Sequence, residues 1–106
     1  MTTATVDQTF AALADPTRLA IVARLSRGVA SVSELAEPFD MSLRAVLKHV
    51  QVLEDAGLVR SAKNGRVRHC ELQHQRIDEA ARWIEQQRAR WERRIDRLER
   101  YVQERE

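Results

Sequence analysis

The sequence predicts a mainly α-helical fold with one small β-hairpin, and three features of its pattern indicate this. Apolar residues recur at helical spacing along most of the chain. Asn64-Gly65 separates two alternating runs, "LVRSAK" and "RVRHCEL", and favours a type I′ turn, in which both central residues have positive φ. A last amphipathic segment covers about residues 74–104. Short helices, a hairpin and a long final helix together predict a winged helix-turn-helix.

The composition bounds the class of protein. The 106 residues suit a single domain, 1–106, and 43% hydrophobic with 32% charged residues is typical of a globular chain. No apolar run approaches the roughly 18 residues that a membrane span needs. The start "MTTATVDQTF" lacks the pattern of a signal peptide. A lone cysteine, Cys70, cannot form an internal disulfide. We therefore expect a cytoplasmic protein that does not contact membranes.

Two helices are expected before the helix-turn-helix unit. The first covers residues 5–14, and Asp15 then suits the N-cap of a second helix that has Pro16 in its first turn. Gly28 is expected to end the second helix. Helical spacing gives each helix a predicted apolar face: Val6, Phe10 and Leu13 in the first, and Leu19, Val22 and Leu25 in the second.

The next two helices form the predicted helix-turn-helix. Ser33 suits the cap of a short helix, "ELAEPF", whose length Pro38 limits. After the turn "FDMS", Ser42 caps a recognition helix at about 42–55, and Gly57 ends it. Spacings of four and three place one apolar face toward the core: Val46, Val50 and Leu53.

Positive charge is concentrated in the predicted recognition helix and hairpin. Residues 41–70 carry six basic and two acidic residues, whereas residues 1–40 carry three Arg and five acidic residues. Residues 71–106 carry nine of each. A local cationic excess of this kind is the electrostatic footprint of a polyanion-binding surface. We therefore expect double-stranded DNA as a partner.

The predicted DNA contacts lie on the recognition helix and on a basic wing at about 60–70. Arg44 suits a guanine, the apolar Leu43 and Leu47 suit a thymine methyl group, and Lys48 suits a phosphate. For His49, a phosphate contact and a hydrogen bond to nearby backbone both remain open. The full predicted set is Ser42, Leu43, Arg44, Leu47, Lys48, His49, Lys63, Asn64, Arg66 and Arg68.

The first and last helices are expected to pair two copies of the chain across a two-fold axis. The apolar stripe of the last helix is longer than a small core requires, although Arg88 interrupts it and argues against a continuous coiled-coil seam. The alternative is that this helix folds back on its own domain. The predicted dimer interface consists of Val6, Phe10, Leu13, Ile77, Ile84, Trp91, Ile95, Leu98 and Val102.

Three segments resemble the ArsR family of bacterial winged-helix repressors: "ALADPTRLAIVARL", "SVSELAEPFDMSLRAVLKHVQVLEDAGLV" and "NGRVRHCEL". The likeness covers about residues 9–72, the DNA-binding core. It implies a homodimer that binds an imperfect inverted repeat in an operator and represses transcription until a signal releases it. The resemblance carries the recognition positions of the family to Leu43, Arg44, Leu47, Lys48 and His49.

The chain departs from the family pattern at several positions. Arg44 stands where relatives often have Pro, and Leu47 where they have Ser, so the operator sequence does not carry over. His69 and Cys70 replace an aromatic pair in the wing. The sequence therefore identifies neither the operator nor an inducer.

The metal-binding Cys-x-Cys of metal-sensing members is absent. The corresponding segment, "SVSELAEPF", has no Cys or His, and no His follows His74 in the last helix. We therefore place the chain in the branch without this motif and expect no metal and no cofactor. For Cys70 an unreactive strand cysteine is favoured, and a redox sensor beside Arg68 and His69 is the alternative.

The leading function is a transcriptional repressor that binds DNA. Its rival is a winged-helix protein–protein adaptor that acts through the C-terminal helix. The cationic recognition helix and wing favour the repressor, because an adaptor does not need them. An enzyme is not expected, because the sequence has no Gly-rich phosphate loop, no metal-ligand set, and no nucleophile with a base at useful spacing.

Overall fold

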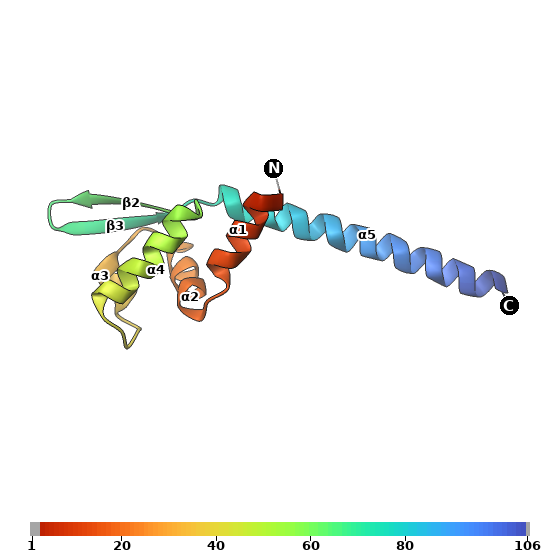
Figure 1. Cartoon of the computed structure of the whole chain (residues 1–106), viewed down its shortest axis with the longest axis horizontal. Coiled ribbons are helices and arrows are strands. Elements are labelled where there is room, and N and C mark those ends of the chain that lie inside the picture. Colours follow the sequence, from red (N-terminus) through yellow and green to blue (C-terminus); the bar gives the residue numbers. More distant parts are fainter. Residues whose placement is uncertain (1–2, 106) are drawn as a thin grey trace.

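The computed structural model describes residues 3–105 and has the fold class that the sequence predicts (Figure 1). Five helices and three strands follow one another along the chain. They are α1 (Thr3–Leu13), α2 (Pro16–Leu25), β1 (Ala30–Ser31), α3 (Val32–Ala36), α4 (Leu43–Asp55), β2 (Val59–Asn64), β3 (Val67–Leu72) and α5 (Gln75–Arg105). Helices α3 and α4 are the helix-turn-helix, and β2–β3 is the wing.

Helix α2 begins as predicted but buries a different face. Asp15 is its N-cap and accepts a hydrogen bond from the backbone N–H of Arg18 at 3.0 Å. The buried residues are Ile21 and Leu25, while Leu19 is 53% exposed, so its predicted place in the core is wrong. Leu19 precedes Ile21 by two residues, about 200° of helical rotation, and therefore lies on the opposite side of the helix.

Helix α3 starts at a capping box whose N-cap is Ser31, two residues before the predicted cap Ser33. The Ser31 hydroxyl accepts a hydrogen bond from the Glu34 N–H at 3.1 Å, and the Glu34 carboxylate accepts one from the Ser31 N–H at 3.1 Å. This reciprocal pair satisfies two backbone N–H donors at the start of the helix. Ser33 and the residues that follow it cannot form such a pair. The predicted cap at Ser33 is therefore wrong.

The sheet has three strands, one more than the predicted ribbon. Its order is β1-β3-β2, all antiparallel, with Ala30 opposite Cys70. The hairpin loop is Gly65-Arg66, because Asn64 still pairs with Val67. Only Gly65 in this loop has positive φ, +67°, which fits a type II′ turn with Gly first. The predicted type I′ turn at Asn64-Gly65 is therefore wrong by one residue.

The core lies between α2, α3, α4 and the base of the sheet. The predicted core face of α4 is confirmed, and Gly57 follows this helix in the left-handed region with φ +78°. The core cluster consists of Ala12, Ile21, Leu25, Ala30, Val32, Leu35, Val46, Val50, Leu53, Leu58, Val59 and Cys70.

Helix α5 leaves the domain. Its N-terminal turns contact α1, and the remainder extends away from the other elements (Figure 1). The described chain therefore measures 72 × 28 × 22 Å along its principal axes. The last helix does not fold back on its own domain, which contradicts that alternative.

Candidate nucleic-acid interface

Helix α4 presents one row of side chains to the outside while the opposite row anchors it. Ser42 is the N-cap, and its hydroxyl accepts a hydrogen bond from the Ala45 N–H at 3.1 Å. Because a strong cap fixes where the helix begins, it also fixes which residues occupy the first turns. The exposed residues of this row are Leu43, Arg44, Leu47, Lys48 and Gln51.

The exposed row combines two apolar side chains with two cations. Leu43 is 50% exposed and Leu47 is 39% exposed, whereas Leu53 of the same helix is fully buried. Among residues 3–105, neither Arg44 nor Lys48 forms an ion pair with an acidic side chain. Such a row has free donors for base edges and phosphates and apolar surface for methyl groups.

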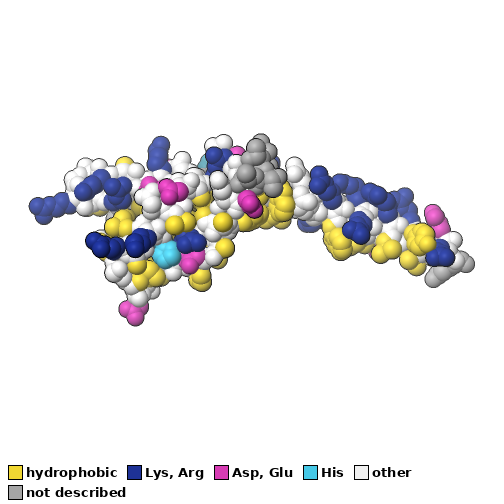
Figure 2. Space-filling view, viewed as in Figure 1, with side chains coloured by type: hydrophobic (Ala, Val, Ile, Leu, Met, Phe, Trp, Pro, Cys, Tyr) yellow, Lys and Arg dark blue, Asp and Glu magenta, His cyan; other side chains and the backbone are white. Residues whose placement is uncertain are grey.

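The wing adds its cations beside this helix. Lys63, Asn64, Arg66 and Arg68 are all exposed and lie at or next to the hairpin loop. Figure 2 shows Lys and Arg side chains gathered over the wing. The structure therefore brings the predicted wing residues together on one projection.

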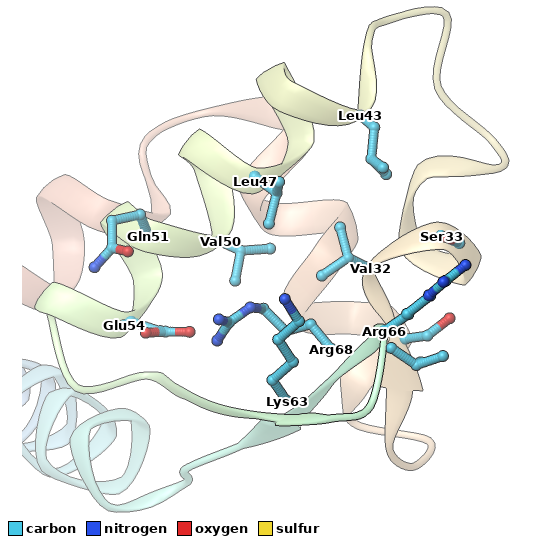
Figure 3. Close-up of a pocket in the computed structure, with 12 residues that line it drawn as sticks. Val32, Ser33, Leu43, Leu47, Val50, Gln51, Glu54, Lys63, Arg66 and Arg68 are labelled. Atoms are coloured by element: carbon cyan, nitrogen blue, oxygen red, sulfur yellow. The ribbon is translucent and has the colours of Figure 1, made fainter.

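A hollow of about 500 Å³ lies between α4 and the wing (Figure 3). Figure 3 shows Lys63 and Arg68 pointing into it from the wing, opposite Leu47 and Val50 of α4. The hollow is lined by Ser31, Val32, Ser33, Leu43, Leu47, Val50, Gln51, Glu54, Lys63, Arg66, Val67 and Arg68. Five of the ten predicted DNA-contacting residues therefore line one concave surface, which combines apolar side chains of α4 with cations of the wing. Arg44 and Lys48 are exposed on α4 but do not line it.

His49 lies away from this surface. Its ring is half-buried at the junction with α1 and α2, where Nδ1 is 3.3 Å from Arg18 Nη1 and 3.8 Å from Asp15 Oδ2. Arg18 also donates to the carbonyl oxygen of Ala12 at 2.5 Å, at the end of α1. This network joins α4 to the preceding helices. It favours a packing role for His49, and its contact with DNA stays a prediction.

Gln51 and Glu54 are the two polar residues of α4 that line the hollow and that the sequence did not predict. Glu54 accepts a hydrogen bond from the Ser61 hydroxyl, and Ser61 Oγ accepts one from Arg68 Nη1 at 2.9 Å. Gln51 lies one turn beyond Leu47 on the same exposed side, so continuing the spacing would have identified it. Glu54 gave no comparable signal, because its partner is on a strand whose register had to be known.

Cys70 belongs to strand β3, and its side chain is fully buried. Burial raises the pKa of its thiol, and the nearby Glu54 carboxylate raises it further. A raised pKa leaves little thiolate at neutral pH, and the thiolate is the reactive form. The structure therefore favours the unreactive strand cysteine over the redox sensor.

The predicted dimer residues fall into two groups. Val6 is only 3% exposed, so it belongs to the interior of the chain, and its predicted place on a free interface is wrong. Phe10 packs edge-to-face on Trp83, with ring centroids 5.8 Å apart, while Leu13 and Ile77 pack partly against the core. The α1–α5 contact explains this difference, because it uses the first apolar face inside one chain.

The second group lies on the projecting part of α5. Trp91 is 59% exposed and Leu98 is 60% exposed. Figure 2 shows hydrophobic side chains along one side of this segment and Lys and Arg side chains along the other. The outward-facing residues of the predicted stripe are Ile84, Trp91, Leu98 and Val102, with Ile95 half-buried between them.

Within residues 3–105, no group of three or more His, Cys, Asp and Glu side chains is arranged to hold a metal ion. None of the described helices is both long and apolar enough to span a membrane.

Comparisons with known proteins agree with this geometry. Residues 13–62 match a family model described as a helix-turn-helix domain. The HTH-type transcriptional regulator Rv2034 of Mycobacterium tuberculosis is 49% identical over 53 residues, which are 50% of this chain and 50% of that protein. The chain thus matches about half the length of this relative.

Two solved structures are similar over nearly the whole chain. ArsR family transcriptional regulator RHA00566 is 46% identical, with a TM-score of 0.82 over 87% of this chain and 95% of that one. An ArsR-like transcriptional regulator from Rhodococcus sp. RHA1 is 36% identical, with a TM-score of 0.76 over 90% of each. On this identity and coverage, the chain belongs to the ArsR family of helix-turn-helix transcriptional regulators.

Proposed function

We propose that this chain is a homodimeric repressor that binds an inverted-repeat operator in double-stranded DNA. One observation carries the proposal: the apolar side chains Leu43 and Leu47 of the exposed row of α4 line the same hollow as three cations of the wing. A helix of this width fits the major groove, and a basic hairpin beside it reaches the phosphate backbone or the adjacent minor groove. The regulators that the chain resembles support the same role.

Each part of the surface has its own role in this proposal. Arg44 reads a guanine edge through its two-pronged guanidinium, while Leu43 and Leu47 contact thymine methyl groups. Lys48 neutralises a phosphate, which positions the protein without specifying sequence. Backbone contacts on the wing side come from Lys63, Asn64, Arg66 and Arg68, and Ser42 lies at the helix start, where backbone N–H groups face a phosphate.

Dimerisation supplies the second recognition helix. The exposed apolar row of α5 has no partner among residues 3–105, and a face of this length is rarely left in water. Pairing of two copies through α5, beside the half-buried Phe10 of α1, relates the two α4 helices by a two-fold axis. Successive major grooves on one side of DNA are about 34 Å apart, which sets the separation that the dimer must achieve.

The same α5 surface also suits the rival function, a protein–protein adaptor. An adaptor has no use for the unpaired cations Arg44 and Lys48, and its binding to DNA would be weak and without sequence preference. In the repressor proposal, the protein acts in the cytoplasm without enzymatic activity, metal or cofactor.

The test is selection of bound duplexes from a random pool, followed by measurement of affinity at several salt concentrations. We expect a palindromic consensus, and an affinity that falls linearly on a log–log salt plot with a slope of about −0.9 per phosphate contact. Failure to enrich any sequence would contradict the proposal. Weak binding to every duplex in moderate salt would favour the adaptor.

A further inference from the structure

Core packing fixes only the base of the wing. Ser61 and Cys70 lie opposite each other, and Cys70 is buried. Beyond this pair every residue of both strands is exposed, so no buried side chain holds the outer wing at a set distance from α4. These residues are Ala62, Lys63, Asn64, Val67, Arg68 and His69.

A chain of two hydrogen bonds connects the outer wing to the recognition helix. The Ser61 hydroxyl of β2 donates to Glu54 in the last turn of α4, and Arg68 of β3 donates to Ser61 Oγ at 2.9 Å. Among the side-chain hydrogen bonds of residues 3–105, the bond to Glu54 is the one that joins α4 to the wing. Both wing strands are therefore tied to one carboxylate.

Glu54 is also the one acidic residue that lines the hollow, which three cations line as well. Figure 3 shows its carboxylate facing Arg68 across the hollow. A negative charge on a surface that binds phosphate lowers affinity through repulsion. Its presence there points to a role other than strengthening attraction to DNA.

We propose that Glu54 is a positioning residue for sequence discrimination, which rests on the DNA-binding function proposed above. It holds Arg68, through Ser61, at a fixed place relative to α4. The wing then reaches the backbone only when α4 is seated in a matching groove. Release of Arg68 frees a mobile cation for phosphates of any sequence, and phosphate contacts carry no sequence information.

Three variants separate this role from simple charge removal. Ser61→Ala breaks the connection without changing charge. Glu54→Gln weakens it, because the amide oxygen still accepts from Ser61 but carries no charge. Asp55→Asn is the matched control, because Asp55 is the adjacent exposed acid and accepts from Gln51 instead of from the wing. The quantity to compare is the ratio of affinities for the selected palindrome and for a random duplex at one salt concentration.

We expect Ser61→Ala to lower this ratio by about tenfold, as loss of a hydrogen bond to a charged group does, and Glu54→Gln to lower it in the same direction by less. Asp55→Asn should leave it within about twofold. If Glu54→Gln and Asp55→Asn tighten both duplexes equally, charge alone acts and the proposal is wrong. If Glu54→Gln proves too unstable to assay, Ser61→Ala decides the outcome by itself.

Amide hydrogen exchange of the free protein tests the connection without DNA. We expect faster exchange at residues 62–69 in Glu54→Gln and Ser61→Ala than in the native chain, and no change in Asp55→Asn. Unchanged exchange in both variants would overturn the proposal even if the native protein binds its operator. Faster exchange in a protein that prefers no duplex would instead refute the proposed function and leave the connection standing.

Discussion

Helix α4 and the projecting half of α5 have the same kind of apolar spacing but opposite environments. In α4, Val46, Val50 and Leu53 are buried by the domain. In α5, Trp91 and Leu98 face outward, because the helix continues past every other element of the chain (Figure 1). Helical periodicity therefore identifies an apolar face but not what covers it. A helix that extends beyond its own domain needs a partner from another chain.

The charged faces of the two helices differ as well. In α5, Arg88 donates to both Glu85 and Glu92. The hydrogen bond from Arg88 lowers the pKa of Glu85, and the two carboxylates raise the pKa of Arg88. In α4, Arg44 and Lys48 have no acidic partner among residues 3–105. The ion-paired Arg88 fits a solvated helix surface, whereas the unpaired Arg44 and Lys48 of α4 are available for phosphates.

The largest effect on stability is expected for the buried face of α4. Leu53→Ala removes a fully buried side chain and leaves a cavity. The free energy of unfolding should fall by about 2–5 kcal/mol. Urea denaturation followed by circular dichroism should show this loss at every protein concentration. A loss below about 1 kcal/mol would mean that α4 is not anchored as described.

The matching change on α5 is Leu98→Ala, which should weaken dimerisation and leave the packing of each domain intact. Burial of a Leu side chain contributes about 1.5–3 kcal/mol, so the dimer dissociation constant should rise about tenfold or more. Sedimentation velocity over a concentration series measures it, and Arg97→Ala, an exposed polar change on the same helix, is the control. A native chain that stays monomeric at micromolar concentration would end the dimer proposal.

On the exposed side of α4, two cations should behave differently. Arg44→Ala should reduce operator affinity by about 1–3 kcal/mol and relax the preference at one base position of each half-site. Lys48→Ala should weaken all duplexes similarly and reduce the salt slope by about one per protomer. Competition binding with single-base operator variants separates the two results. Equal effects of both substitutions on every duplex would refute base reading by Arg44.

The smallest effect concerns the junction that ties α4 to α2. The backbone N–H of Arg18 lowers the pKa of Asp15, and the neighbouring His49 and Arg18 lower it further. Because the folded-state pKa is lowered, its stabilisation is complete above the usual value of about 3.8 and disappears as the pH falls through the folded value. Asp15→Asn keeps a capping oxygen, so stability at pH 7 should change little. Urea midpoints from pH 2 to 7 should show a weaker acid dependence in the variant.

Local signals predicted much of the fold. Asp15 and Ser42 are the caps of their helices, and the spacing of Val46, Val50 and Leu53 identified the core face of α4. These features depend on neighbours in sequence. Leu19 and Val6 were misplaced because an apolar residue at helical spacing does not reveal which side another element covers.

The candidate site was less predictable where it depends on distant contacts. The exposed positions of α4 followed from its buried face, but the place of His49 required Asp15 and Arg18 in space. Glu54 required the register that places Ser61 and Arg68 above the end of α4. Three-dimensional proximity between segments far apart in sequence decides both roles.

The central claim is that two copies present their α4 helices to successive major grooves on one side of DNA. The direct test is affinity for the selected palindrome compared with the same half-sites moved apart by five base pairs, about half a helical turn. Our account predicts that this insertion reduces affinity to that of a single half-site, because the second α4 then faces away from its sequence. Equal affinity for both duplexes would contradict the account.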